Sequence, residues 1–236
     1  CDSVTFSEEL RKRLIREGAS LVGFADLAGI SPEADMPFGI SIAYALDLKV
    51  ISQIVSGPTS EYAALYHRAN DMLNKLGEMA EGMIASKGYK AKRIPSTIKV
   101  DPNKLFTPLP HKTTATRAGL GWIGKCALLV TKPFGSAVRL ASVLTDMELP
   151  VGVPIESSKC GSCASCVKAC PVNAPTGKEW DVRLKREDFF KVELCYGETA
   201  KNANRPEIGA MICGMCIAAC PWTKAYIAGG NFEDRR

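Results

Sequence analysis

The segment CGSCASCVKACP, residues 160–171, decides the fold of this chain, because it places four cysteines at short fixed intervals and follows them with proline. A shorter version, CGMCIAACPW, follows at residues 213–222. The order C-x2-C-x2-C-x3-C-P is typical of loops that bind iron–sulfur clusters, and the first segment matches it at every position. Because the pattern occurs twice, the sequence predicts a protein with two 4Fe-4S clusters.

The spacing also indicates which cysteines share a cluster. The first three cysteines of the run bind one cubane, and in two-cluster ferredoxins the fourth binds the other cubane. The second segment has one cysteine fewer, and Cys195 lies between the two segments as a supplier. We therefore predict that cluster one is held by Cys160, Cys163, Cys166 and Cys220, and cluster two by Cys170, Cys195, Cys213 and Cys216.

Disulfide bonds and zinc sites are the other common uses of closely spaced cysteines. A disulfide framework is typical of secreted chains much shorter than 236 residues, and no secretory signal is visible here. Zinc prefers two C-x-x-C pairs held apart by a loop, and zinc or structural thiols stay open as alternatives. Cys1 and Cys126 fall outside the two ligand sets, and we expect Cys126 to be a small buried residue at the start of a strand.

The composition is that of an ordinary globular protein, with 46% apolar and 23% charged residues. No apolar run reaches the length of a membrane span, so we expect no membrane span and a cytoplasmic location. The formal charge of +5 counts every cysteine as neutral. Metal-bound thiols are deprotonated, so two loaded clusters would add about −4 and bring the chain near neutrality. The charge therefore gives no reason to expect a nucleic-acid partner, and no basic run with interleaved aromatic residues adds one.

The periodicity of apolar residues predicts a mixed α/β domain before the cysteines. We expect helices at 7–18, with Ser7 as the N-cap, at 59–87 and at 111–120. We expect strands at 19–27, 38–47, 89–95, 126–131 and 136–145, of which the first two read as buried on both faces. Pro150, Pro154 and the polar residues after them indicate a boundary. We therefore predict two domains, residues 1–152 and residues 153–236.

A second unusual segment, TRAGLGWIGKCALLVT at 116–131, surrounds Trp122 and Lys125 with three glycines. Glycine allows the backbone to approach a large ligand closely, but a helix end followed by a tight turn would need it too. A dinucleotide site is excluded, because the glycines follow a predicted helix and precede a strand, the reverse of that fingerprint. The segment therefore predicts either a ligand-contacting loop or a turn.

The segment AGLGWIGK at 118–125, the eight-cysteine pattern with one lone middle cysteine, the final CPW and the YHR at 66–68 together resemble the epoxyqueuosine reductase family. More distantly they resemble the corrinoid reductive dehalogenases. The resemblance covers nearly the whole chain. It implies an α/β (α+β), nitroreductase-like domain of the cobalamin-binding type, followed by a two-cluster ferredoxin-like domain.

The resemblance also implies a function. In those enzymes electrons pass through the clusters to the cobalt of a bound corrinoid, which performs the reduction. It implies a cobalamin seated on the loop of Gly119, Gly121, Trp122, Gly124 and Lys125, and an electron donor such as a ferredoxin or flavodoxin.

The chain departs from the family where a proton donor is expected. The acidic residue that the family places about fourteen residues before its GLG corresponds here to Leu105, which argues against epoxyqueuosine reduction itself. Asp101 and His111 are the remaining candidates for a catalytic acid, and histidine changes its protonation near neutral pH without help. The longer family members carry a C-terminal repeat extension that this sequence does not contain, so we expect a short paralogue.

Three functions follow from these patterns. The first is a corrinoid-dependent reductase with a small-molecule substrate, in which His111 or Asp101 is the acid. The second is a two-cluster electron carrier or reductive activator of a partner redox protein, which the missing acid favours. A nucleic-acid modifying enzyme that acts on a flipped base ranks last, because only the family resemblance supports it.

Overall fold

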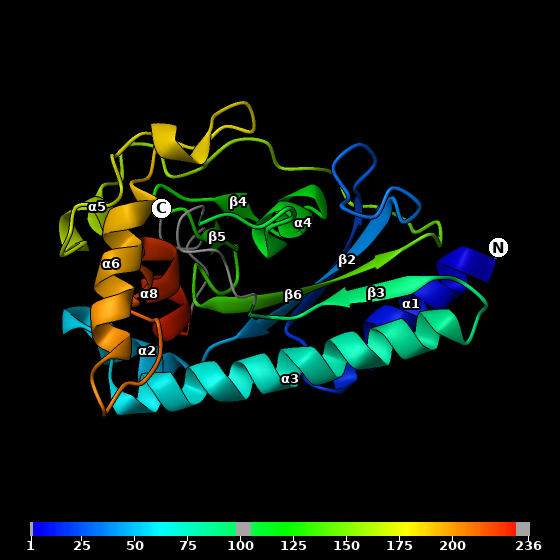
Figure 1. Cartoon of the computed structure of the whole chain (residues 1–236), viewed down its shortest axis with the longest axis horizontal. Helices are drawn as coiled ribbons and strands as arrows, with labels where there is room; N and C mark the ends of the chain where they lie inside the picture. The colour runs from blue at the N-terminus through cyan, green and yellow to red at the C-terminus, as the bar shows by residue number, and fades with distance from the viewer. Residues whose placement is uncertain (1, 98–104, 230–236) are drawn as a thin grey trace. The chain divides into compact units, whose positions relative to one another are not determined.

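The computed structural model describes residues 2–97 and 105–229, and Figure 1 shows the course of the chain. The chain divides into two compact units, each assembled from several stretches of sequence. Unit one contains residues 1–45, 69–120 and 139–155, and unit two contains 46–68, 121–138 and 156–236. The prediction of a mixed α/β fold is confirmed. The predicted boundary after residue 152 stays a prediction.

Unit one is built on a four-stranded sheet. Its strands run in the order β1 (Leu21–Asp26), β2 (Phe38–Ala45), β6 (Val138–Thr145) and β3 (Ala91–Ile94). β1 pairs antiparallel with β2, and β3 pairs antiparallel with β6. The central residues of β1 and β2 are buried on both faces, as the apolar runs predicted.

Helices cover both faces of this sheet. Apolar residues of α1 (Asp2–Arg16) and α3 (Ser60–Ala85) pack against one face, where alternate strand residues such as Phe24 and Val143 are fully buried. The short helix α4 (His111–Arg117) packs on β1 and β2, and strand residues of the opposite parity, such as Ala25 and Leu144, share a core with residues flanking it. Burying a side chain such as Phe24 contributes about 1.5–3 kcal/mol. The sheet of unit one therefore lies between layers of helix.

The first helix begins earlier than the sequence predicted. Ser7 was expected to be its N-cap, but the helix starts at Asp2 and Ser7 is a fully buried residue within it. The reason is the apolar spacing. Phe6, Leu10 and Leu14 are four residues apart and all pack into the core, so the helix that presents them includes the turn before Ser7.

Unit two contains short elements. They are α2 (Leu48–Ser52), the 3-10 turn η1 (Ile54–Ser56), β4 (Trp122–Ile123), β5 (Leu129–Val130), α5 (Ser165–Ala169), the 3-10 turn η2 (Arg186–Asp188), α6 (Val192–Ala203), α7 (Met215–Ala219) and α8 (Pro221–Ile227). The side chain of Asp47 caps α2 by accepting from the amides of Lys49 and Val50 at 2.9 and 3.2 Å. β4 and α6 were not predicted.

Aromatic side chains join the three stretches of unit two. The rings of Trp122 and Trp222 meet edge to face with centroids 5.0 Å apart. The rings of Phe134 and Tyr226 meet in the same way at 5.2 Å, and the Tyr226 hydroxyl donates to the carbonyl of Leu46 at 3.0 Å. Because edge-to-face pairs contribute about 0.5–1.5 kcal/mol beyond their buried area, these contacts tie the hairpin, α8 and the 46–68 stretch into one core.

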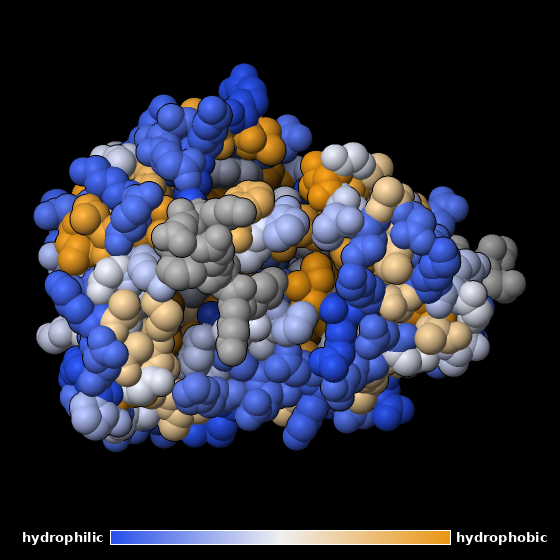
Figure 2. Space-filling model, in the orientation of Figure 1, coloured by the Kyte–Doolittle hydropathy of each residue, from blue (hydrophilic) through white to orange (hydrophobic). Residues whose placement is uncertain are grey.

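The outer side of α3 is polar. Its exposed residues include His67, Asp71, Lys75 and Glu78, and Figure 2 shows hydrophilic residues along this helix. Within residues 2–97 and 105–229, none of the helices combines the length and the apolarity that a membrane span requires.

Replacing Gly121 with alanine is expected to destabilise unit two by about 2–4 kcal/mol, which urea denaturation would measure. A Cβ at this position would lie 2.2 Å from the carbonyl oxygen of Val130, so the β4–β5 pair would have to move apart. The matched control is Gly82→Ala in α3, where a Cβ meets nothing within 4 Å. That change is expected to stabilise the helix by about 0.5–1 kcal/mol. Equal stability of the Gly121→Ala variant and the unaltered protein would contradict this account.

Candidate iron–sulfur site

The hairpin of β4 and β5 places Lys125 and Cys126 at its turn. The amide of Gly124 donates to Leu128 at 2.9 Å, and the amide of Ala127 donates to Gly124 at 2.8 Å, which leaves Lys125 and Cys126 as the two central residues. Ala127 has φ 59, an uncommon backbone conformation for alanine. The sequence therefore presents two adjacent functional side chains from a tight turn in unit two.

One cavity in unit two collects the cysteines predicted for cluster one. Its volume is about 70 Å³. It is lined by Cys160, Cys163, Cys166 and Cys220, together with Gly124, Lys125, Cys126, Val130, Lys159, Pro221 and Trp222. Four thiols from two distant segments around one cavity are the donor set that a 4Fe-4S cubane requires, so these residues fit the predicted cluster.

Hydrogen bonds shape the loop that carries the first two of these thiols. The amide of Cys163 donates to the carbonyl of Cys160 at 3.1 Å and closes a turn. Gly161, inside this turn, has φ 56, a conformation that glycine adopts readily. Its amide donates to the exposed carboxylate of Glu179 at 2.6 Å, and the Cys160 amide donates to Ser158 Oγ at 3.3 Å. The turn therefore fixes the direction of both side chains.

Lys125 reaches this loop from the hairpin. The side chain is 7% exposed, and its ammonium group donates to the carbonyl of Gly161 at 2.7 Å and to that of Cys163 at 3.1 Å. Gly124 beside it also lies close to the thiols, since a Cβ there would be 3.6 Å from Cys160 Sγ and 2.9 Å from Val130 Cγ2. The backbone of the turn can approach the cavity only because this residue is glycine.

Two of the predicted ligands, Cys220 and Cys213, are influenced by other cysteines as well as by burial. Burial raises the pKa of Cys220, and Cys160 and Cys166 raise it further. Burial also raises the pKa of Cys213, to which Glu198 and Cys170 contribute. Cys220 thus interacts with the first segment's loop, and Cys213 interacts with the fourth cysteine of that segment. The crossed assignment of ligands to the two clusters stays a prediction.

The cysteines predicted for cluster two come from three places in unit two. Cys170 follows α5 and its sulfur accepts from the amide of Ala174 at 3.3 Å, while Cys195 lies in the first turn of α6. Gly214, between Cys213 and Cys216, has φ 85, and a Cβ there would meet Ile54 at 2.5 Å. In the described part of the chain no three His, Cys, Asp or Glu side chains are grouped as for a single metal ion. A cubane makes a different demand, because its ligands are separated by the width of the cluster.

The Cys126 thiol contacts two predicted ligands, Cys166 and Cys216, and the sequence did not reveal these contacts. Its burial was predicted, and the side chain is 4% exposed, but Cys126 lies in the turn before β5 and not at the start of a strand as predicted. A hydrogen bond with Cys166 lowers the pKa of Cys126, but Cys216 and burial outweigh it and leave the pKa well above its ordinary value. The Cys126 thiol therefore lies between a predicted ligand of cluster one and a predicted ligand of cluster two. Only the three-dimensional fold brings these three residues together.

The five residues predicted to seat a corrinoid fall into both units. Gly119 belongs to unit one, where it ends α4 with φ 73 and packs against the carbonyl of Val153. Gly121, Trp122, Gly124 and Lys125 belong to unit two. Close backbone packing already explains Gly121, and Trp122 is 1% exposed. Its indole Nε1 has no hydrogen-bond partner among the described residues, and a buried donor of this kind is available to a bound group.

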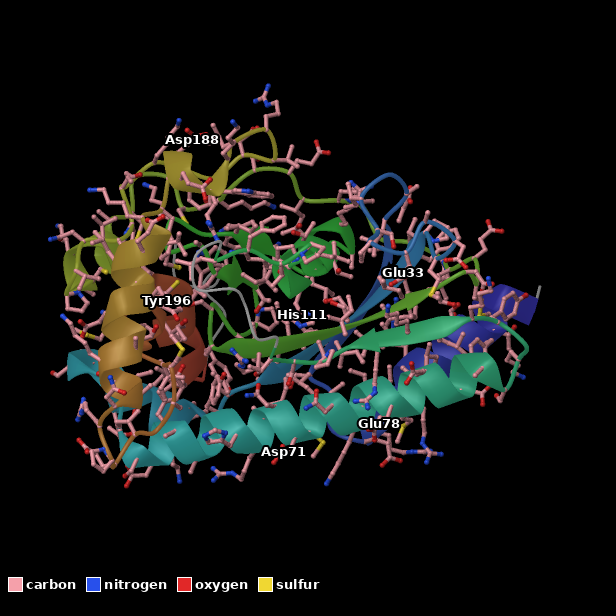
Figure 3. The ribbon with its side chains drawn as sticks, in the orientation of Figure 1. Glu33, Asp71, Glu78, His111, Asp188 and Tyr196 are labelled. Carbon is pink, nitrogen blue, oxygen red and sulfur yellow. The ribbon has the colours of Figure 1, made fainter. Side chains whose placement is uncertain are left out.

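One of the two candidate acids, His111, belongs to unit one. Asp101 lies outside the described residues, and Leu105 is half-buried with φ 47. His111 begins α4 and lies beside β6 (Figure 3), where Nδ1 is 2.9 Å from Ser142 Oγ and Nε2 is 2.8 Å from the carbonyl of Pro95. Since a carbonyl only accepts, Nε2 carries the proton and Nδ1 accepts from Ser142.

The protonation of His111 follows from these surroundings. Burial lowers the pKa of His111 to about 4, and the Arg139 cation contributes, although the hydrogen bond to Pro95 acts in the opposite direction. The imidazole is therefore neutral at pH 7 with both nitrogens occupied. The catalytic role of His111 stays a prediction.

His111→Gln is expected to flatten the dependence of stability on pH. The folded pKa of about 4 lies below the ordinary value of 6.5, so protons bind the unfolded chain preferentially. The stability is fully present above about pH 6.5 and is lost as the pH falls toward about 4, by about 1–2 kcal/mol between pH 7.5 and 5. Hydrogen exchange of the β6 amides at both pH values measures it.

His67→Gln is the control for this experiment, since His67 is the second histidine of the chain and lies exposed on α3. It controls for the replacement of an exposed histidine by glutamine. The same slope in the His111→Gln variant as in the unaltered protein would mean that His111 does not titrate in this way.

Comparison with families of known proteins identifies the cysteine-rich segment. Residues 159–223 match the family described as a 4Fe-4S double cluster binding domain. Curated relatives include the epoxyqueuosine reductases of Pseudomonas aeruginosa, 29% identical over 78% of this chain and 51% of the relative, and of Vibrio cholerae, 30% identical over 72% and 45%. The enzyme of Aliivibrio fischeri is 36% identical over 67% of this chain and 40% of its own length. The chain thus spans about half the length of these relatives.

Solved structures with a similar fold include a reductive dehalogenase and an epoxyqueuosine reductase. A reductive dehalogenase described in terms of B12-dependent dehalogenation has a TM-score of 0.72 at 17% identity, over 94% of this chain and 32% of its own. An epoxyqueuosine reductase crystallised with a tRNA-Tyr epoxyqueuosine-modified stem loop has a TM-score of 0.60 at 22% identity, over 97% and 67%. At these identities the likeness concerns the fold alone.

Proposed function

Because the chain is a homologue of the epoxyqueuosine reductases, we propose that it is a reductase that passes electrons through two 4Fe-4S clusters to a bound cobalamin. In this proposal residues 1–152 form a nitroreductase-like domain of the cobalamin-binding type, and residues 153–236 form a ferredoxin-like domain. Cytoplasmic ferredoxin or flavodoxin would supply the electrons. The relatives are named as reductases, which are oxidoreductases.

One observation carries the proposal, namely the cavity ringed by Cys160, Cys163, Cys166 and Cys220. These thiols belong to segments about fifty residues apart in sequence, yet they line one site with the turn of the 118–125 segment. A loaded cluster there would lie beside Lys125 and Gly124, which the resemblance assigns to the corrinoid loop. That placement supports electron transfer from cluster one toward a cofactor held by this loop.

Two observations support a bound cobalamin. The unpartnered indole N–H of Trp122 is a buried donor in the loop concerned, and one neighbour of similar fold is described as B12-dependent. When bound, a cobalamin would supply a cobalt centre that accepts electrons and reduces a small-molecule substrate. Gly121, Trp122, Gly124 and Lys125, which all belong to unit two, would hold it.

A second candidate function is that of an electron carrier or reductive activator for a partner redox protein. Leu105, at the position of the family's acid, favours it, because a leucine side chain cannot deliver a proton. His111 is neutral at pH 7, which also favours the electron carrier over an enzyme that uses this residue as its acid. In that case the clusters would reduce a partner and the chain would have no substrate of its own.

The two functions are separated by anaerobic reconstitution with iron and sulfide, followed by titration with cob(II)alamin under electron paramagnetic resonance. Saturable loss of the dimethylbenzimidazole nitrogen splitting would show a corrinoid bound base-off and would support the reductase. Full iron loading with an unchanged cobalamin spectrum would exclude a reductase that takes up free cobalamin and leave the carrier. Bound zinc in place of iron would overturn both.

The substrate requires a separate assay. An epoxyqueuosine-containing tRNA stem loop is a substrate to test, since the curated relatives are named for that reaction. Because Leu105 stands at the position of the acid, we expect no turnover of this stem loop by the loaded chain.

A further inference from the structure

Lys125 brings a positive charge into the interior beside the cluster-one cavity. The side chain is 7% exposed and lines the cavity with the four thiols. Its ammonium group has three N–H donors, two of which bond the carbonyls of Gly161 and Cys163. Both carbonyls lie in the loop that presents Cys160 and Cys163. The cation is therefore fixed to the cluster-binding loop itself rather than to an acidic partner.

A loaded cluster carries a net negative charge, on which the Lys125 cation would act. Four thiolates and a core of about +2 leave a net charge of about −2, and reduction adds one more electron. A buried cation stabilises the more negative, reduced state most, because charges interact strongly where water is excluded. Charge and hydrogen bonding near the sulfurs are among the factors that set the potentials of such clusters.

We propose that Lys125 positions the Cys160–Cys163 loop through its two carbonyl contacts and raises the reduction potential of cluster one. This inference rests on the proposed function, since it presumes that the four thiols hold a cubane. It assigns Lys125 to the cluster rather than to the corrinoid alone. If cluster one has the higher reduction potential, an electron that enters through cluster two reduces cluster one preferentially.

An acidic group acts on one member of the second ligand set. Glu198, on α6, is the acidic group that acts on Cys213, and it forms an ion pair with Lys201 at 3.6 Å. An acidic group near a cluster disfavours the reduced state. Lys125 and Glu198 thus act on the two ligand sets in opposite directions.

Lys159 provides a matched comparison within the same site. It also lines the cavity, and its ammonium group lies 5.9 Å from the centroid of the Trp122 ring, but its side chain is exposed. Water and salt screen an exposed charge, so removing it should change the potential much less. The two lysines carry the same charge and differ in burial and in the contacts they make.

The experiment uses the full chain, reconstituted anaerobically, in four forms: unaltered, Lys125→Met, Lys125→Arg and Lys159→Met. Iron and sulfide analysis measures loading, and a redox titration followed by electron paramagnetic resonance measures both midpoint potentials. We expect Lys125→Met to shift one of the two potentials to a more negative value. Lys125→Arg should shift that potential much less, because it keeps the charge, and Lys159→Met should leave both potentials nearly unchanged.

The outcomes separate this inference from the proposed function. A chain that binds about eight iron atoms, with the same two potentials in the Lys125→Met variant, overturns the role of Lys125 and leaves the clusters in place. An unaltered chain that binds no iron overturns the proposed function itself. If Lys125→Met does not load, Lys125→Gln takes its place, because it also removes the charge but keeps N–H donors for the carbonyls of Gly161 and Cys163. If Lys159→Met shifted a midpoint potential as much as changing Lys125 does, then surface charge in general, and not the buried position of Lys125, would set that potential.

Discussion

Replacing Cys220 with alanine is expected to lower the bound iron from about eight atoms per chain to about four, as measured by iron analysis after anaerobic reconstitution. Cys220 lines the cavity of Cys160, Cys163 and Cys166, and its pKa is raised by two of these thiols as well as by burial. A cubane that loses one of its four thiolates is expected to be lost or to remain as an incomplete cluster with a changed electron paramagnetic resonance signal. Cluster two keeps all four of its predicted ligands.

A double variant tests whether the ligation is crossed. If Cys160 and Cys220 serve the same cluster, Cys160→Ala combined with Cys220→Ala still leaves about four iron atoms. If each segment held its own cluster, the double variant would lose both. Cys126→Ala is the control, because this thiol lines the same cavity but lies outside both ligand sets, and it should retain about eight iron atoms. Loss of a whole cluster in that control would make Cys126 a ligand and overturn the assignment.

Removal of iron by a chelator is expected to unfold the cysteine-rich part of unit two and to leave the sheet of unit one intact. Helices α5 and α7 have five residues each, far below the length at which an isolated helix is stable. They pack against each other, and each carries or adjoins predicted ligands of both clusters. In such sites the free energy of metal binding is free energy of folding.

Hydrogen exchange measures this effect. Amides of α5 and α7 should exchange on the order of 100-fold faster after iron removal, which corresponds to about 2.7 kcal/mol of lost protection. The β1 and β2 amides serve as the internal control, because the described part of unit one contains no cysteine and its core is apolar. Unchanged protection of both helices in a sample shown to be free of iron would mean that packing alone stabilises them.

Elements with a strong local signal were predicted well. The apolar spacing of α3 placed it at 59–87, and the helix runs over Ser60–Ala85. The strands around Phe24 and Ile42 were placed within a few residues, since buried apolar runs between turn residues are distinctive. The short helix α4 was extended by a few residues beyond Arg117, where Gly119 ends the turn. Local chemistry decides these cases.

Elements without such a signal were missed. β4 consists of two residues, Trp122 and Ile123, and exists only because β5 pairs with it across the turn. α6 contains Cys195 and alternates polar and apolar residues without a clear stripe, so the sequence around that cysteine did not read as a helix. Tertiary packing fixes such elements, and a single sequence does not reveal their partners.

For the site, spacing predicted which cysteines gather, but not what surrounds them. The four cysteines predicted for cluster one line one cavity. Lys125 was predicted as a corrinoid contact, and the structure places its ammonium group on the carbonyls of the cysteine loop. Thirty-odd residues separate Lys125 from that loop, so no local pattern could have paired them. Contacts of this kind depend on the fold as a whole.

The discontinuous make-up of unit two has a consequence for how the protein is made. A ribosome releases the chain from its N-terminal end, so the stretch 46–68 and the β4–β5 turn emerge well before any of the eight predicted ligands. With crossed ligation, both cysteine segments would have to emerge before either cubane could be closed. Cluster insertion would therefore be a late event in biosynthesis, and a gene fragment encoding only the cysteine-rich stretch would lack the hairpin that carries Lys125 and Cys126.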